Sequence, residues 1–259
     1  MSRARVLVAS LIACSSVLAA SCSSGGSNDR ELVVLAAASL TDAFHAIGWN
    51  FETANPGVSV TFDFGPSDGL ASSIDQGAPA DVFAAASPSW MDDVSRNGPG
   101  VTERTDFARN RLVVVVPSDD PAGISSILDL ARPGVRLVLA AEGVPAGDYA
   151  RAILANAGIE RAALANVVSN EEDVRGVLTK IATGEADAGI VYVTDVTPDV
   201  ASQVRTIQIP SSINVIATYP IAVVADSKEA DLASRFVRYV LGPGQQTLRS
   251  LGFEPPTAG

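Results

Sequence analysis

The hydrophobic pattern of this chain alternates between short β-branched runs and stretches in which apolar residues recur at helical spacing. The first apolar run covers residues 32–35, which is typical of a buried strand. One helical face follows, with apolar side chains at Leu40, Phe44, Ile47 and Phe51. Ser39 lies between the two patterns, and serine is a preferred N-cap residue. We therefore expect a strand that leads directly into a helix capped by Ser39.

The same alternation recurs along the chain. Further strands are expected at residues 58–64, 81–86, 111–117, 135–140, 167–168, 188–193 and 219–225. Helices are expected after Ser67, behind Pro88, at 126–131, from 142–149 through Ala157, from Asn170 onward and, as the last element, at 232–241. Strands and helices in this order are typical of parallel or mixed sheets flanked by helices. The pattern predicts an α/β fold.

Two successive sets of strands and helices, followed by a final apolar strand, predict two lobes joined by crossing strands, near residues 111–117 and between residues 206 and 225. Residues 32–110 together with 217–259 are expected to form the first lobe, and residues 111–216 the second. Ligands of open α/β sheets bind beyond the carboxyl ends of the strands. With two such sheets facing each other, we expect the ligand site in the cleft between the lobes.

Four helix N-termini follow directly after predicted strands. Two of them begin near Ser39 and Ser67, a third within residues 142–149, and a fourth within residues 170–175. The first turn of a helix carries backbone N–H groups that lack intrahelical partners, so it is a ready site for an anion. Residues 171–173 are all acidic, and we interpret them as a solvated first turn that contacts no ligand.

Residues 1–21 have the pattern of a secretory signal. Two arginines precede an uncharged apolar run at residues 6–20, which is too short for a membrane span. Cys22 follows at the position of the acylated cysteine of a bacterial lipoprotein, and residues 22–31 are expected to form a flexible tether. Two alternatives stay open. Cys14 has preceding residues that fit the lipoprotein motif better but a shorter apolar run, and export without a lipid would leave Cys22 an incidental thiol.

The composition supports a globular protein and argues against several partners. The chain has 259 residues, of which 47% are hydrophobic, and this is enough for one large core or two smaller ones. Its formal charge is −11, which becomes about −13 without the two arginines of the signal. Nucleic acid is disfavoured because the sequence shows no basic patch. Any anion site must therefore act through local dipoles and hydrogen bonds.

Several stretches of the sequence, taken in order, resemble a known family. They are residues 36–41 (AAASLT), 77–83 (GAPADVF), 144–150 (VPAGDYA), 172–176 (EDVRG), 189–192 (GIVY) and 219–224 (YPIAVV). Together they resemble the molybdate-binding proteins of bacterial ABC transporters, the ModA family, from about Leu32 to Phe253. The resemblance implies a two-lobed periplasmic-binding-protein-like fold of type II. It also implies an extracytoplasmic solute-binding protein, anchored to the membrane through a lipid on Cys22.

The function that the resemblance implies is capture of molybdate or tungstate and delivery to an ABC permease. Such a protein is a monomer, is not an enzyme and needs no cofactor besides its ligand. The metal is held as an oxyanion, without direct metal ligands. By the family's motifs, the anion-binding residues are Ser39 and Ser67 through hydroxyl and backbone N–H, Ala146 and Val174 through backbone N–H, and Tyr192 through its hydroxyl.

The second serine motif departs from the family's serine-rich turn. Pro66 removes one N–H donor there, and Asp68 adds a carboxylate. If Asp68 faced the ligand, it would repel a dianion or accept a proton from hydrogen phosphate. This leaves a receptor of the same fold for sulfate or phosphate as the alternative. If Asp68 instead pointed to solvent, it would stabilise the first helical turn.

Other chemistry-bearing residues support no rival function. His45 is the only histidine, and no acids or cysteines cluster around it at metal-ligand spacing. A hydrolase using Ser39 as nucleophile would need a base, and His45 lies far round the same helix. Trp49 and Trp90 are interpreted as packing residues on helices. Tyr192 as an ordinary core tyrosine remains the alternative to its role as a ligand donor.

Overall fold

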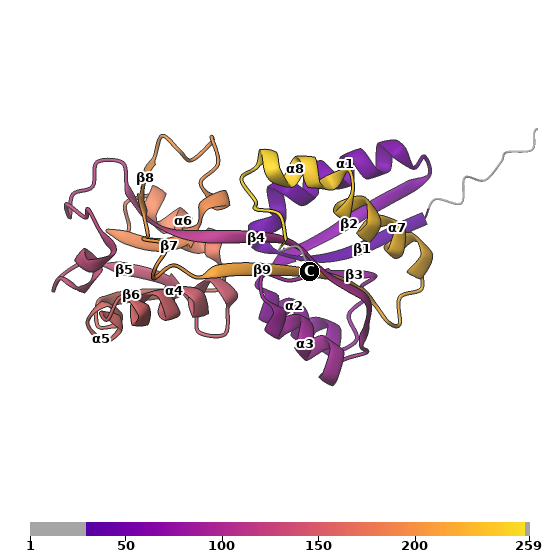
Figure 1. Cartoon of the computed structure of the whole chain (residues 1–259), viewed down its shortest axis with the longest axis horizontal. Coiled ribbons are helices and arrows are strands. Elements are labelled where there is room, and N and C mark those ends of the chain that lie inside the picture. The colour runs from indigo at the N-terminus through magenta and orange to yellow at the C-terminus, as the bar shows by residue number, and fades with distance from the viewer. Residues whose placement is uncertain (1–29, 257–259) are drawn as a thin grey trace, which may run out of the picture.

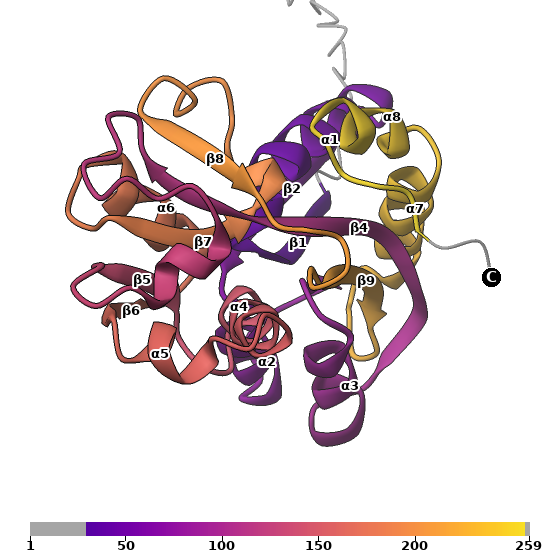
Figure 2. The same ribbon diagram turned by 60° about the vertical axis from the view of Figure 1, so that its left-hand side comes forward.

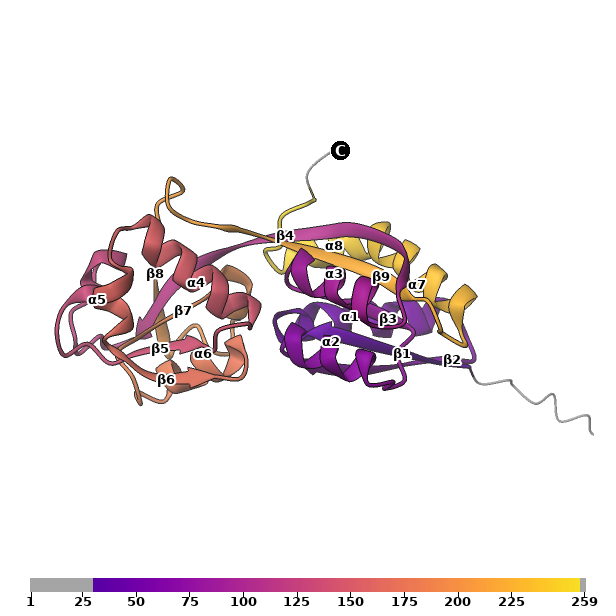
Figure 3. The same cartoon turned by 90° about the horizontal axis from the view of Figure 1, so that it is seen from below.

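Two long strands connect the two halves of the molecule. The computed structural model describes residues 30–256. β4 (Val101–Pro117) and β9 (Ile216–Val224) run antiparallel to each other between two groups of helices and strands (Figures 1 and 3). The predicted signal at residues 1–21, the predicted acylation site Cys22 and most of the tether lie outside the described residues.

The first group of elements, called lobe 1 here, is built on a mixed sheet. β1 (Arg30–Ala37) pairs in parallel with β2 (Val58–Gly65) and β3 (Val82–Ala84), and β3 pairs antiparallel with β9. Five helices cover this sheet: α1 (Thr41–Ala54), α2 (Ser67–Asp75), α3 (Pro88–Asn97), α7 (Ala230–Leu241) and α8 (Gly244–Ser250). Figure 1 shows α1, α7 and α8 on one face of the sheet, with α2 and α3 on the other.

Alternation along β1 explains why both faces are covered. Leu32 and Val34 are buried in the cluster that contains Phe44 of α1, whereas Leu35 is buried with Leu70 of α2 in a second cluster. Successive side chains of a strand point to opposite faces, so a run of apolar residues needs helices on both sides. The sequence of β1 therefore dictates the two helical layers of lobe 1.

The second group, called lobe 2, repeats the arrangement. β5 (Leu137–Ala140) pairs in parallel with β6 (Val167–Glu171) and β7 (Ala188–Tyr192), and β4 pairs antiparallel with β7 and β8 (Val204–Gln208). The helices of this lobe are α4 (Pro145–Asn156), α5 (Glu160–Leu164) and α6 (Val174–Ala182). The part of the chain that the structure describes also contains three 3₁₀ turns: η1 (Ala38–Leu40), η2 (Ile127–Ala131) and η3 (Val193–Asp195).

β4 belongs to both lobes. Its first part, up to Arg111, pairs with β9, and from Leu112 onward the strand pairs with β7 and β8. Figure 2 shows it as one continuous strand that passes from the α3 side of the molecule to β7. The expected crossing near residues 111–117 therefore lies on this strand, but the strand begins ten residues earlier than the hydrophobic pattern predicts. The limits of the lobes at 110/111 and 216/217 stay a prediction.

The sequence pattern predicts the order of the elements and misses three of them. The expected α/β fold is confirmed, but β8, α5 and α8 were not expected, so the helix near 232–241 is not the last element. The first part of β4 has no continuous apolar run, because most of its residues from 101 to 106 are exposed. None of the helices within residues 30–256 is long and apolar enough to cross a membrane.

Three local expectations are wrong. The tether ends before Arg30, because Arg30 and Glu31 belong to β1, where the N–H of Arg30 donates to the carbonyl of Gly57 at 2.9 Å. The Arg30 guanidinium also pairs with Asp231 at 2.6 Å. Trp49 is not a packing residue, since it is 73% exposed. Ser39 is not a helix cap; it lies inside η1, and Leu40 occupies the N-cap position of α1.

Gly147 is required where α4 approaches the end of β5. A Cβ at this position would lie 2.1 Å from the carbonyl oxygen of Ala141 and 2.4 Å from that of Ala140. Gly147→Ala should lower the free energy of unfolding by about 2–3 kcal/mol, since backbone atoms must move. Gly65→Ala is the matched control: its Cβ would meet only Leu70 at 3.6 Å, and its stability should change by less than about 1 kcal/mol. Equal destabilisation of the two variants in urea unfolding would contradict the close approach.

Candidate functional site

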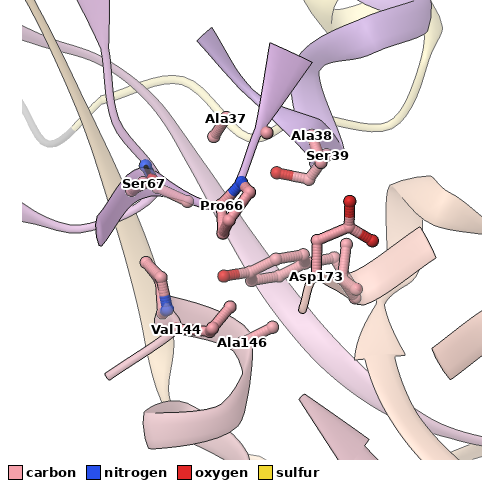
Figure 4. Close-up of a pocket in the computed structure, with 13 residues that line it drawn as sticks. Ala37, Ala38, Ser39, Pro66, Ser67, Val144, Ala146 and Asp173 are labelled. Carbon is pink, nitrogen blue, oxygen red and sulfur yellow. Dashed lines mark hydrogen bonds between the residues drawn. The ribbon is translucent and has the colours of Figure 1, made fainter. Parts of the chain in front are cut away.

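A small cavity lies between the two lobes, and all five predicted site residues line it. Lobe 1 contributes Ala37, Ala38, Ser39, Gly65, Pro66, Ser67 and Ala86. Lobe 2 contributes Val144, Pro145, Ala146, Asp173, Val174 and Tyr192. Figure 4 shows Ser39 and Ser67 on one side of the cavity, with Val144, Ala146 and Asp173 opposite them.

The size of the cavity limits its ligand to a single small ion or molecule. The space open to the centre of a water molecule is about 20 Å³. A sphere of that volume, enlarged by the 1.4 Å radius of water, has a radius of about 3 Å. A space of this size matches one inorganic ion.

The two serines of lobe 1 present hydroxyl groups with different partners. The Ser39 Oγ lies 3.1 Å from the Tyr219 hydroxyl oxygen. Ser67 is the first residue of α2, and its buried Oγ accepts the N–H of Ala86 at 3.0 Å. A hydroxyl has one proton and two acceptor lone pairs, so Ser67 keeps its proton for a ligand while accepting this bond.

Lobe 2 contributes the N-termini of two helices. In α4, Val144 is the N-cap and Pro145 follows, so Ala146 carries the first backbone N–H of the helix. In α6, Asp173 is the N-cap, and its Oδ1 accepts the N–H of Gly176 at 2.9 Å. The first turns of both helices keep N–H groups that need a partner from outside the helix.

Asp173 is the site residue that the sequence analysis missed. The acidic run at 171–173 is not a first helical turn: Glu171 ends β6, and its carboxylate pairs with Lys180 at 3.0 Å. Asp173 caps α6 and lines the cavity, whereas the interpretation of the run as a solvated first turn does not place it there. A signal for this cap is present in the sequence, since aspartate is a preferred N-cap residue and Asp173 directly precedes the helical run that begins at Val174.

Tyr192 ends β7 and is one of the residues that line the cavity. The residue is 1% exposed, and its hydroxyl oxygen has no hydrogen-bond partner among residues 30–256. Burial raises the pKa of the phenol well above its ordinary value, so the group stays neutral and keeps its proton. A buried hydroxyl without a partner costs free energy, and a ligand that accepts its proton would remove that cost.

Asp68 does not line the cavity. It lies in the first turn of α2, where the helix dipole favours a carboxylate. The alternative of a side chain directed fully to solvent is also wrong, because the Asp68 Oδ1 is buried and lacks a partner among the described residues. Asp68 therefore supplies no carboxylate to the wall of the cavity.

The wall of the cavity contains no cationic side chain among the described residues. The nearby Arg175 of α6 instead pairs with Asp42 of α1 at 3.3 Å. His45 is exposed and packs beside Phe62 and Phe64, away from the cavity, so Ser39 has no histidine base. The arrangement can hold an anion through neutral N–H and O–H donors.

Comparisons with known proteins agree with this geometry. Residues 32–254 match the family described as bacterial extracellular solute-binding protein. The molybdate-binding protein ModA of Mycobacterium tuberculosis is 42% identical over 253 residues, covering 97% of this chain and 95% of that protein.

Two solved structures share the fold at low sequence identity. The periplasmic molybdate-binding protein of Azotobacter vinelandii has a TM-score of 0.75 and 19% identity, covering 87% of this chain and 100% of that one. The sulfate-binding protein SubI of Mycobacterium tuberculosis has a TM-score of 0.77 and 18% identity, covering 88% of each chain. At these identities the likeness concerns the fold alone.

Asp195 should make the stability of the protein depend on pH. Its carboxylate accepts the N–H of Tyr192 at 2.9 Å, and burial raises its pKa to about 7. Between about pH 4 and 7 the folded state therefore holds a proton that the unfolded state lacks, so this group's contribution to stability falls as pH rises through that window. Asp195→Asn should be the more stable protein above pH 7, by up to about 3–4 kcal/mol, with a smaller advantage at pH 5.

Thermal unfolding between pH 5 and 8 measures this difference. Asp199→Asn removes the same formal charge from an exposed position and is the matched control. A pH-independent difference between Asp195→Asn and the wild type would contradict the buried, titrating carboxyl.

Proposed function

This chain belongs to the bacterial extracellular solute-binding proteins, and we propose that it captures molybdate or tungstate between its lobes for delivery to an ABC permease. The observation that carries the proposal is the set of donors around one ion-sized cavity. These donors are the hydroxyls of Ser39, Ser67 and Tyr192 and the N-termini of α4 and α6 at Ala146 and Val174. The relative that is 42% identical is itself a molybdate-binding protein, which supports the choice of ligand.

Neutral donors suit a fully deprotonated oxyanion. Molybdate and tungstate present four oxygens that accept hydrogen bonds and carry no proton to donate. Helix N-termini and hydroxyls replace the water around such an ion without adding a counter-charge. The carboxylate of Asp173 does not help an anion directly; it accepts the N–H of Gly176 and so caps α6.

Sulfate or phosphate is the weaker alternative. Its main support was a carboxylate from Asp68 that could accept a proton from hydrogen phosphate. Asp68 is not part of the cavity wall, and the Asp173 carboxylate, which is part of it, already accepts the N–H of Gly176. The fold alone does not decide the ligand, since proteins with molybdate and with sulfate share it.

The cellular setting follows from the same proposal. We propose that the protein is not an enzyme, acts as a monomer on the extracytoplasmic side, and is held at the membrane through a lipid on Cys22. Its relatives are solute-binding proteins, which supports the location. Lipidation rests on the sequence pattern around Cys22, outside the described residues.

We propose hinge closure as the mechanism, with β4 and β9 as the hinge between residues 32–110 plus 217–259 and residues 111–216. Three contacts support it because each joins the lobes beside the cavity. The Trp90 Nε1 donates to the carbonyl of Gly143 at 2.8 Å, the Tyr149 hydroxyl donates to the carbonyl of Ala86 at 3.2 Å, and Arg175 pairs with Asp42. An anion that bridges the lobes shifts the population towards this closed state.

Ligand binding should stabilise the chain from Ser23 onward against heat. Molybdate or tungstate at roughly a thousand times its dissociation constant should add about 4 kcal/mol, or about 8–16 °C in melting temperature. Sulfate and phosphate at the same concentration should give a much smaller shift. A shift with phosphate alone would contradict the proposed ligand while leaving the anion site intact.

Tyr192→Phe should weaken molybdate binding roughly tenfold to a hundredfold, because it removes one hydrogen bond to a charged ligand, worth about 1.5–3 kcal/mol. Isothermal titration calorimetry measures the change. Tyr239→Phe is the control: this tyrosine of α7 packs on Phe51 and is not part of the cavity wall. Unchanged affinity in Tyr192→Phe would remove the phenol from the site.

Closure should be visible in tryptophan fluorescence, because the two tryptophans of the chain lie in different places. Trp90 bridges the lobes, whereas Trp49 is 73% exposed on α1. In Trp49→Phe, saturating molybdate should still change the emission, and in Trp90→Phe the change should be nearly lost. If the ligand-induced change in emission were lost in Trp49→Phe and retained in Trp90→Phe, closure at the Trp90 contact would be contradicted.

A further inference from the structure

A row of buried polar side chains leads away from the cavity beneath Ser39. The Ser39 Oγ lies 3.1 Å from the Tyr219 hydroxyl oxygen, and the Asn110 Nδ2 lies 3.5 Å from that same oxygen. Asn110 also donates to the Thr194 Oγ1 at 2.8 Å. Tyr219 and Asn110 are 0% and 1% exposed, and neither lines the cavity. The row therefore lies behind the wall of the cavity and reaches it through Ser39.

The backbone fixes the orientation of the Asn110 amide. The Asn110 Oδ1 accepts the N–H of Arg111 at 2.9 Å. An amide oxygen accepts and an amide nitrogen donates, so the Nδ2 must face Tyr219 and Thr194. The Tyr219 hydroxyl oxygen is therefore already an acceptor on the side of Asn110.

The direction of the next bond follows from this. Burial raises the pKa of Tyr219 far above its ordinary value, so its hydroxyl keeps its proton. With a lone pair occupied by the amide of Asn110, the phenol can give that proton to the Ser39 Oγ. Ser39 then accepts from Tyr219, and its own proton is free to point into the cavity.

We propose that Tyr219 and Asn110 are positioning residues that orient the Ser39 hydroxyl as a donor to the bound anion. This inference rests on the proposed function, since an anion without protons accepts hydrogen bonds and gives none. Ser39 in the opposite orientation, donating to Tyr219, would turn an oxygen lone pair towards the anion and repel it. Hydrogen bonds that run in one direction also polarise one another in a buried site.

The two tyrosines near the cavity thus have different roles. Their rings pack edge to face with centroids 5.8 Å apart. Tyr192 lines the cavity and its hydroxyl has no partner among residues 30–256, whereas the hydroxyl of Tyr219 is already bonded to Ser39. Tyr192 is proposed to bind the anion directly, and Tyr219 acts through Ser39.

A double-mutant cycle with molybdate tests the inference. Tyr219→Phe keeps the ring and should weaken binding about threefold to tenfold in the wild-type background. In the Ser39→Ala background the same substitution should change affinity less than twofold, because the group through which it acts is gone. Calorimetry gives the affinities, and melting of the four ligand-free proteins measures any general loss of packing.

Contrary outcomes distinguish a failure of the orienting role of Tyr219 from a failure of the proposed ligand. An equal loss of affinity from Tyr219→Phe in both backgrounds would assign Tyr219 a packing role and overturn the inference. If the wild type binds sulfate or phosphate instead of molybdate, the cycle is run with that anion, and the proposed ligand fails independently of the orientation. A wild type that binds none of these anions overturns both.

Asn110→Asp provides a second test, because it reverses the direction of the hydrogen bonds from residue 110 to Ser39 while preserving the shape of the side chain. The new carboxylate still accepts from Arg111 but cannot donate, so Tyr219 would donate to it and Ser39 would turn its proton away from the anion. Binding should weaken more than tenfold in the wild-type background and clearly less in the Tyr219→Phe background. If Asn110→Asp lowered the affinity by the same factor in the two backgrounds, charge repulsion alone would explain the loss, and the proposed orientation would be wrong.

Discussion

Backbone N–H groups at the first turn of a helix must find a partner outside that helix, and the proposed site depends on this constraint. In lobe 2, two helices begin at one cavity, and in lobe 1 the chain enters η1 and α2 at the same cavity. β1 and β2 end beside each other, with Ala37 paired to Gly65, so their continuations meet at that edge. The donors converge because the carboxyl ends of these strands do.

The convergence of strand ends does not by itself fix the position of each hydrogen-bond donor. Close contacts within the wall of the cavity fix these positions. Gly147 lets α4 press against the backbone after β5, which sets the position of Ala146. Asp173 accepts one N–H of α6, and Ser67 accepts the N–H of Ala86 at the end of β3. These hydrogen bonds within the protein hold parts of the wall in place.

The sequence predicts those parts of the molecule in which local pattern and environment agree. Buried runs such as residues 32–35 are strands, and all five residues implied by the family motifs line one cavity. The errors arise where tertiary contacts decide. Ser39 lies in a 3₁₀ turn that hydropathy does not distinguish from a helix start, and the exposed first part of β4 is a strand because β9 pairs with it. The orientation of Asn110 is set by a backbone N–H, which no side-chain pattern reveals.

A chain with a formal charge of −11 attracts no anion through its overall field, so selectivity has to come from the cavity. The buried carboxyl of Asp195, beside the end of β7, makes this requirement stricter, because its ionised form repels an anion. A cationic side chain would attract any anion of suitable charge. Oriented neutral donors bind only an ion that has the right size and accepts a hydrogen bond at every oxygen. In the proposed site Ser39 is such a donor only while Tyr219 donates to its Oγ, because the Ser39 proton then points into the cavity.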